Sequence, residues 1–257
     1  MSPRTTRSLR HEYELYIEHE IENYKESIPR SALLAIGDEA AAKIASEPQF
    51  ALTELLLLEE VDRIIANRLR LPKYDTWRRR RLKLHEELRR PEHWGLTSSD
   101  ALVRTIGGEV GHVLVAGDAA HRSALYLAAN GCDVTAIEAE EESVQRVMEA
   151  AIQAGLAERV HAVAAELVDF RPAAPLHAVV CSHATLNSLS ARERARVISV
   201  LQSATLDGGV HLVETIIAGS SALEELRATY AGWHISIEVA TGDKQTFLAR
   251  KDDGVSH

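Results

Sequence analysis

The chain contains 257 residues, of which 46% are hydrophobic and 26% are charged. This composition is ordinary for a globular protein and allows one large domain or two modest ones. The formal net charge of −9 argues against a nucleic-acid binder in general. Residues 63–90 are different, because eleven Lys or Arg residues there stand against only three Asp or Glu.

Membrane and metal proteins are also disfavoured. Apolar stretches such as residues 55–58 are far too short to cross a bilayer, and the charged N-terminal residues contain no apolar signal core. We therefore expect a cytoplasmic protein with no membrane segment. The two cysteines, Cys132 and Cys181, form neither a Cys-x-x-Cys pair nor a disulfide framework, so we expect no metal site.

The first part of the chain has helical patterns. Apolar residues spaced by three and four predict a helix over residues 9–28, ended by Pro29. Asp38 is the expected N-cap of an Ala-rich helix, and the apolar run of residues 50–71 predicts another. Asp75 or Thr76 is the expected N-cap of a helix that ends before Pro91. We expect four to five helices in an all-α N-terminal domain, residues 1–95.

After a linker near residues 95–100, the pattern changes to short β-rich runs alternating with helical stretches. The predicted strands are residues 112–116, 133–137, 160–164, 176–181, 210–214, 234–239 and 246–250. Helices are expected to begin near residues 123, 141, 191 and 221. This alternation predicts an α/β domain over residues 96–257, with a Rossmann-like, seven-stranded sheet that binds ligands at the carboxyl ends of its strands. The last two strands suggest an antiparallel hairpin.

The run from Val113 reads strand, turn, helix, glycine, strand and acid, which is typical of a nucleotide-binding βαβ unit. In such a unit the ligand lies against the first turn and the N-terminus of the helix, where backbone N–H groups are free. Glu138 ends the second strand 21 residues after Gly117, a spacing that fits an acid accepting hydrogen bonds from ribose hydroxyls.

The stretch RSALYLAANGCDVTAIEAEEESV resembles the S-adenosylmethionine (SAM) methyltransferases of the tellurite-resistance family. The segments HAVVCSHATLNSL, TLDGGVHLVE, LRATYAGWHISIE and TFLARK resemble later parts of the same family in the same order. The resemblance covers about residues 111–251. It implies a class I methyltransferase fold with SAM as the cofactor.

The resemblance also implies roles for individual residues. Glu138 would hold the ribose, Glu166 would face the adenine amino group, and the turn from His183 to Thr185 would line the side of methyl transfer. Ser182, which precedes this turn, is a further candidate for cofactor binding. Among these residues His183 is the candidate catalytic residue, because it follows a strand where an acceptor would lose its proton.

The glycine-rich loop departs from the family pattern. Three glycines of the family correspond to Gly117, Ala119 and His121, with Asp118 between the first two. Glycine serves in such loops because it reaches positive φ and lets a ligand approach the backbone closely. We take these four residues as cofactor-binding candidates. Asp118 either contacts the SAM ammonium or caps the following helix.

Other interpretations of the histidines and cysteines remain open. His121, Cys181 and His183 all map near the carboxyl ends of strands, where they could form a general base, a metal site or a metalloid-binding pair. Cys181 lies in an apolar strand and is better explained as a core residue, as buried free cysteines usually are.

The function that these features indicate is SAM-dependent methyl transfer to a small-molecule acceptor. In that case the helical domain forms a lid over the strand ends or a homodimer interface. One alternative is a non-catalytic scaffold or regulatory subunit that has lost SAM binding. Another is a nucleic-acid methyltransferase that uses the arginines from Arg78 to Arg81, although a solvated helix face paired with acidic neighbours explains them as well.

Overall fold

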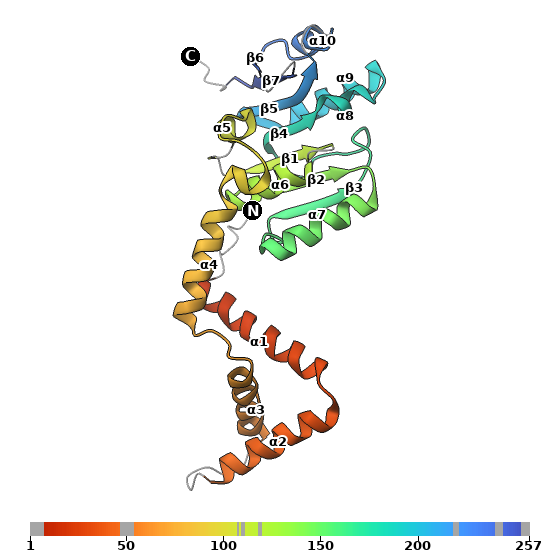
Figure 1. Ribbon diagram of the computed structural model, residues 1–257. Helices are drawn as coiled ribbons and strands as arrows, with labels where there is room; N and C mark the ends of the chain where they lie inside the picture. Colours follow the sequence, from red (N-terminus) through yellow and green to blue (C-terminus); the bar gives the residue numbers. More distant parts are fainter. Residues whose placement is uncertain are drawn as a thin grey trace. The chain divides into compact units, whose positions relative to one another are not determined.

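The computed structural model describes residues 8–46, 54–106, 108, 111–117, 120–217, 221–239 and 244–252. Contacts divide the chain into two compact units, Met1–Leu84 and His85–His257. The division falls inside the long helix α4 (Tyr74–Leu88), which is drawn in yellow-orange in Figure 1. The domain limit at residue 95 stays a prediction.

The N-terminal unit contains the helices α1 (Leu9–Ser27), α2 (Arg30–Ala45), α3 (Glu54–Arg68) and most of α4. The Ser8 side chain caps α1 by accepting a hydrogen bond from the His11 backbone N–H at 3.2 Å. Buried apolar residues from α1, α2 and α3 form the core of this unit: Ile21, Ile36, Ala40, Val61, Ile64 and Ile65. Leu34, Leu55 and Leu58 are exposed, and a dimer through this unit stays a prediction.

Two expected N-caps in this unit are wrong. Helix α2 begins directly after Pro29 and continues through Gly37, so Asp38 lies inside the helix. Ile36 and Ala40 are buried on one face of α2, and this burial keeps the helix continuous across the glycine. Helix α4 begins at Tyr74, so Asp75 and Thr76 lie in its first turn.

The C-terminal unit is built on a seven-stranded sheet with the order β3-β2-β1-β4-β5-β7-β6. The strands are β1 (His112–Ala116), β2 (Asp133–Glu138), β3 (Val160–Ala164), β4 (Leu176–Ser182), β5 (Thr205–Ile217), β6 (His234–Val239) and β7 (Lys244–Arg250). All strands predicted from the sequence are present, although β5 is longer than expected. Strands β1 to β5 pair in parallel, and β7 pairs antiparallel with both β5 and β6. This arrangement confirms the predicted sheet and its antiparallel end.

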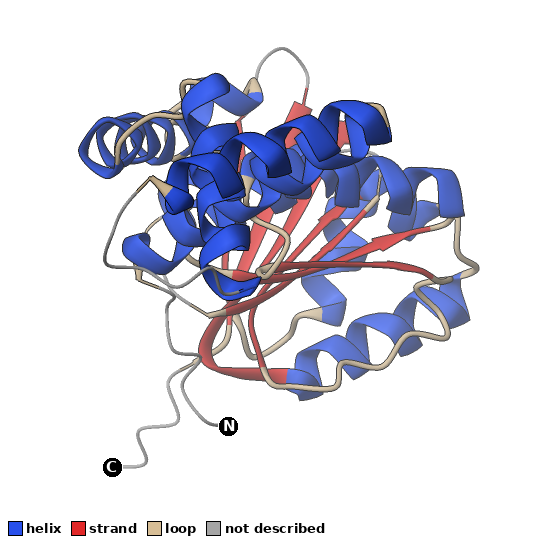
Figure 2. Cartoon of the chain, turned by 90° about the horizontal axis from the view of Figure 1, so that it is seen from below, coloured by secondary structure: helices blue, strands red, loops and turns tan. Residues whose placement is uncertain are grey.

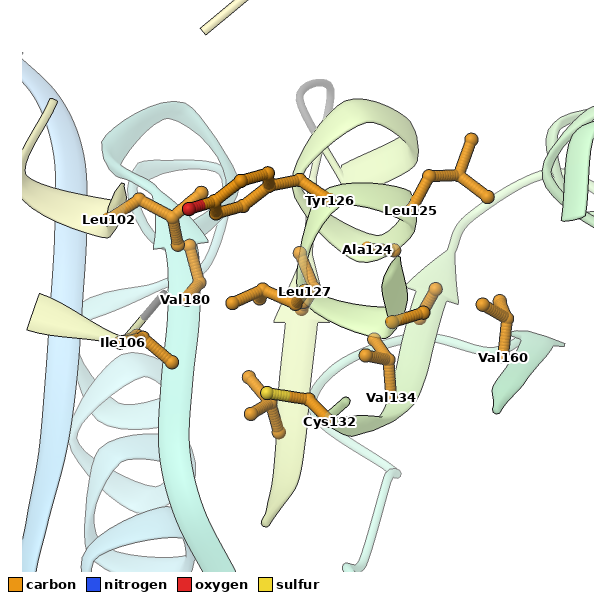
Figure 3. Packing of buried hydrophobic residues seen from close by; sticks show 14 of the residues in the cluster. Leu102, Ile106, Ala124, Leu125, Tyr126, Leu127, Cys132, Val134, Val160 and Val180 are labelled. Atoms are coloured by element: carbon orange, nitrogen blue, oxygen red, sulfur yellow. The ribbon is translucent and has the colours of Figure 1, made fainter. Parts of the chain in front are cut away.

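Helices cover both faces of this sheet (Figure 2). One face carries α5 (Ala101–Thr105), α6 (Ala120–Ala129) and α7 (Glu141–Ala154), after the short helix η1 (Pro91–Trp94). The other face carries α8 (His183–Asn187), α9 (Ala191–Ala204) and α10 (Ala222–Thr229). Figure 3 shows how buried side chains of the first face, among them Leu102, Leu127 and Val180, fill the space between helices and strands. The carboxyl ends of the parallel strands are therefore held by packing on two sides.

A series of buried hydrogen bonds connects polar side chains on the second face of the sheet. The Thr205 hydroxyl donates to the Leu201 carbonyl oxygen at 2.7 Å, so its oxygen accepts from His211 Nε2–H at 2.7 Å. His211 Nδ1 then accepts from the Tyr230 hydroxyl at 2.8 Å. Burial lowers the pKa of His211 to about 3, with Lys251 acting in the same direction. These hydrogen bonds and the lowered pKa thus keep the His211 ring neutral.

Among the described helices, none combines the length and the apolar character that crossing a membrane requires.

Candidate functional site

A cavity of about 410 Å³ opens at the carboxyl ends of the central strands. It is lined by residues from the ends of β1 and β2, from the segment after β3 and from α8, including Gly117, Glu138, Glu140, Glu166, Thr185 and Ser188. In parallel α/β sheets this edge is where ligands bind, because the strand order reverses there. Here β1 pairs with β2 on one side and with β4 on the other, so the cavity lies at such a reversal.

Gly117 follows β1 directly and has a φ of +104°, a conformation that residues with a side chain rarely adopt. A Cβ atom at this position would lie 2.1 Å from Thr185 Oγ1 and 2.8 Å from Ser182 Oγ. The glycine therefore lets the first turn of α8 approach the end of β1. The sequence predicted that a ligand approaches the backbone at Gly117, which stays a prediction; the close approach that the structure shows there is made by side chains of Ser182 and Thr185.

Two hydroxyl groups define the wall of the cavity beside Gly117. Ser182 is the N-cap of α8, since its Oγ accepts a hydrogen bond from the Thr185 backbone N–H at 3.2 Å. The hydroxyls of Ser182 and Thr185 lie 2.8 Å apart. Ser182 is buried, whereas Thr185 lines the cavity, so a ligand would meet the Thr185 side of this pair.

Three carboxylates line the same cavity. Glu138 ends β2 and is half-buried, Glu140 precedes α7, and Glu166 is exposed on the segment after β3. Ionised carboxylates only accept hydrogen bonds, so they fit hydroxyl and amino groups of a ligand rather than phosphates. The structure thus brings Gly117, Glu138 and Glu166 together in one cavity, and their roles toward a ligand stay predictions.

The remainder of the glycine-loop region is described only in part. Asp118 and Ala119 lie outside the described residues, so their roles stay predictions. His121 lies in the first turn of α6 and is exposed. Neighbouring atoms still remove part of the solvent around its ring, and this desolvation lowers its pKa, as do the nearby guanidinium groups of Arg146 and Arg122. His121 is not among the described residues that line the cavity.

His183 belongs to a different cavity. A second cavity of about 310 Å³ lies between α8, α9 and α10 and includes His183, Arg194 and Glu225. Partial burial lowers the pKa of His183, Arg194 lowers it further, and Glu225 has the opposite effect. Helix α8 separates the two cavities, because Ala184, Thr185 and Ser188 face the first while His183 and Leu186 face the second.

The metal and metalloid interpretations gain no support from the described residues. Within the described residues, no group of three His, Cys, Asp or Glu side chains could hold a metal ion. Cys181 is buried in β4, where burial raises its pKa to about 12, and its thiol points to the Leu212 carbonyl oxygen at 3.8 Å. A buried cysteine whose thiol has a raised pKa is unreactive and serves as part of the core.

The sequence interpretation missed two carboxylates at the same edge of the sheet, Glu140, which lines the first cavity, and Glu214. Glu214 lies near the end of β5, where its Cα pairs with that of Ser182, and its pKa is raised by burial and by Asp100. The next residue, Thr215, has a φ of +62° at an irregularity in the pairing of β5 with β7. The available signal was an acid that ends an apolar strand, the same signal that identified Glu138.

The arginine run of α4 is mostly unpaired among the described residues. Arg81 forms an ion pair with Glu12 at 3.2 Å. Arg78, Arg79 and Arg80 are exposed and form no ion pair with any described residue. Pairing with acidic neighbours therefore explains one arginine of the four.

The strand order, the antiparallel last strand and the cavity at the carboxyl edge define a class I methyltransferase fold. The family model described as tellurite resistance protein TehB matches residues 97–235, which is more than half of the chain. The chain belongs to this family, and the resemblance stated from the sequence is confirmed.

Two solved structures with similar folds are distant in sequence from this chain. TehB from Haemophilus influenzae is 17% identical, with a TM-score of 0.46 over 55% of this chain and 57% of that one. The glycopeptide N-methyltransferase MtfA is 14% identical, with a TM-score of 0.45 over 55% of this chain and 83% of that one. This chain thus covers little more than half of the length of the H. influenzae protein. No curated protein sequence matches it significantly.

Proposed function

We propose that the protein transfers a methyl group from SAM to a small-molecule acceptor. The observation that carries the proposal is the grouping of Gly117, Glu138 and Glu166 in one cavity at the carboxyl edge of a class I methyltransferase sheet. Glu138 would accept hydrogen bonds from the ribose hydroxyls, and Glu166 would accept one from the adenine amino group. The lining is acidic, as a hydroxyl-rich and amino-bearing ligand requires.

The chemistry asks little of the protein beyond alignment. SAM supplies an electrophilic methyl group on a sulfonium. The protein would hold the acceptor in line with the carbon–sulfur bond and exclude water. His183 is the proposed proton acceptor, because it follows β4, where an acceptor would lose its proton, and because partial burial and Arg194 lower its pKa and so favour the neutral ring that accepts a proton.

Calorimetric titration with S-adenosylhomocysteine tests the cofactor site. We expect saturable binding, and Glu138→Ala should weaken it by about 1–3 kcal/mol through loss of charge-assisted hydrogen bonds. Glu149→Ala is the matched control, since Glu149 is exposed on α7 and lies outside the cavity. Unchanged affinity in folded Glu138→Ala would remove the ribose assignment. If the parent does not bind S-adenosylhomocysteine at millimolar concentration, the proposal that this protein is a SAM-dependent enzyme is rejected.

The second candidate function is a scaffold that keeps the fold without the cofactor. Ala119 and His121 favour it, because they replace glycines of the family pattern. The double variant Ala119→Gly/His121→Gly separates the two functions. If the parent binds S-adenosylhomocysteine, restoring glycine should change its affinity only modestly. Binding that is detectable only in the double variant would favour the scaffold.

A further inference from the structure

Helix α4 has one side that contacts α1 and another that α1 leaves open. The ring of Trp77 lies 5.4 Å from that of Tyr13, and Arg81, four residues later, pairs with Glu12 at 3.2 Å. Residues two positions after these lie about 200° round the helix, so they face away from α1. The open side and its edge carry three exposed basic residues, which we call the basic surface: Arg79, Arg80 and Lys83.

The charges of the basic surface are not compensated by the part of the chain that the structure describes. The Arg79 guanidinium donates one hydrogen bond, to the Asp75 carbonyl oxygen at 3.3 Å, and no described acid pairs with it or with the other two residues. Lys83 lies four residues after Arg79 and three after Arg80, so these like charges are neighbours on the helix and repel one another. The basic surface therefore lacks a partner of opposite charge.

Helix α1 carries the opposite charge on its exposed part. Ile17, Ile21 and Tyr24 pack into the core of the N-terminal unit and fix which side of the helix is buried. The exposed part carries three acids spaced by four residues, which we call the acidic surface: Glu18, Glu22 and Glu26. Like charges at this spacing also repel and weaken a helix.

The acidic surface is compensated only in part. Lys25 Nζ lies 2.8 Å from Glu22 Oε1, but it lies equally close to Asp62 Oδ1 of α3, so its charge is shared. Glu18 and Glu26 form no ion pair with any residue that the structure describes. Two helices of one unit thus carry like-charged surfaces of opposite sign.

The two surfaces cannot neutralise each other within one N-terminal unit, because each lies away from the contact between α1 and α4. Two copies related by a twofold axis can bring them together, and the symmetry then makes the same contact twice. Each surface also has an exposed apolar neighbour. Leu15, three residues before Glu18, is 38% exposed, and Leu82, three residues after Arg79, is 40% exposed.

We propose that the protein forms a homodimer in which the basic surface of α4 in each copy contacts the acidic surface of α1 in the other. Complementary charges would set the register of the two copies, and Leu15 and Leu82 would be buried between them. A second copy fits better than a nucleic acid, because the acidic surface of the same unit repels phosphate groups. The dimer does not depend on the proposed methyl transfer.

Analytical ultracentrifugation of the full chain tests the dimer. We expect the parent to sediment at twice the mass of one chain at about 0.1 mM protein. Its dissociation constant should rise about tenfold or more between about 0.1 M and about 1 M sodium chloride, because salt screens the charges.

Charge reversal identifies the surfaces. Arg79→Glu/Arg80→Glu/Lys83→Glu makes both surfaces acidic, and Glu18→Lys/Glu22→Lys/Glu26→Lys makes both basic. Each variant alone should dimerise about tenfold or more weakly than the parent, because like charges then face each other. An equimolar mixture of the two should form a heterodimer, because both contacts again join opposite charges.

The matched control is Arg192→Glu/Arg196→Glu on α9, at two exposed positions of the C-terminal unit. It should dimerise as the parent does. Circular dichroism checks that each variant is folded. If a reversed chain does not fold, Arg79→Gln/Arg80→Gln/Lys83→Gln takes its place and should also weaken the dimer.

Three results would overturn the proposal: a monomeric parent, reversed chains that dimerise as the parent does, or a mixture that contains no heterodimer. Titration of the parent with single-stranded oligo(U) examines the other occupant of the basic surface. A monomer that binds this RNA, and loses it when the basic surface is reversed, assigns the surface to a polyanion instead of a second copy.

Discussion

The two units of the chain bury their side chains to different extents. In the C-terminal unit, the two faces of the sheet carry clusters of 24 and 17 buried apolar residues among those described. The corresponding cluster of the N-terminal unit has six. A residue between sheet and helices is constrained from several directions, whereas a residue on the N-terminal helices meets one narrow stripe of neighbours. Substitutions should therefore change stability strongly in the C-terminal unit and weakly in the N-terminal unit.

The largest effect is expected at Gly117. Gly117→Ala introduces a Cβ 2.1 Å from Thr185 Oγ1 at a φ of +104°, so the backbone is strained and the Thr185 side chain must move. We expect a loss of about 2–4 kcal/mol in the free energy of unfolding, together with a loss of adenosyl binding. Urea denaturation and calorimetry measure the two effects. A variant as stable as the parent would show that the contact between β1 and α8 is loose.

A somewhat smaller effect on stability is expected from the protonation of His211 at low pH. The pKa of His211 falls from 6.5 to about 3 in the folded protein, so below pH 6.5 the unfolded chain binds more protons than the folded one. The contribution of neutral His211 is complete above pH 6.5 and is lost as the pH falls towards 3. Between pH 6.5 and pH 5 this loss lowers the free energy of unfolding by about 2 kcal/mol.

His211→Leu isolates this contribution. The variant should be less stable than the parent at pH 7, because Thr205 and Tyr230 lose their partner, and the difference should narrow as the pH falls. The measurement is urea denaturation at several pH values. His161→Gln, at an exposed position of β3, is the control and should keep the pH dependence of the parent. A difference that stays constant with pH would contradict the buried neutral ring.

The smallest effect is expected in the N-terminal unit, at Gly37. This glycine lies inside α2, and nothing lies within 4 Å of the position that a Cβ would occupy. Gly37→Ala should therefore raise the free energy of unfolding by about 0.5–1 kcal/mol, because alanine loses less backbone entropy in a helix. Thermal denaturation checks the sign. Destabilisation would mean that α2 requires the glycine for packing.

The difference between the units also explains what the sequence could predict. Strands such as β1 and β4 were identifiable because burial on both faces of a parallel sheet demands continuous apolar runs. The start of α2 was misplaced because Gly37 and Asp38 look like a helix boundary when local preference is considered alone. Burial of Ile36 and Ala40 outweighs that preference.

The candidate site was predictable to the same limited degree. Glu138 could be placed because strand length and chain distance from Gly117 determine where it lies. The sequence could not predict that His183 faces away from the first cavity. This depends on the side of a five-residue helix from which each side chain projects. So short a helix has too few residues for a periodic pattern. Glu214 ends an apolar strand as Glu138 does and could have been identified on that ground, whereas its neighbour Asp100 could not, because it is far away in the sequence.

The shared wall formed by α8 has a thermodynamic consequence. Any displacement of this helix that enlarges one cavity changes the other, so a ligand that moves α8 on binding in one cavity would change the affinity of the other. Linkage requires this influence to be equal in both directions. If S-adenosylhomocysteine tightens the binding of a ligand in the second cavity by some factor, that ligand must tighten the binding of S-adenosylhomocysteine by the same factor. Thr185, which lies against Gly117 on one side of the helix, and Leu186, on the other, are the residues through which that coupling would act.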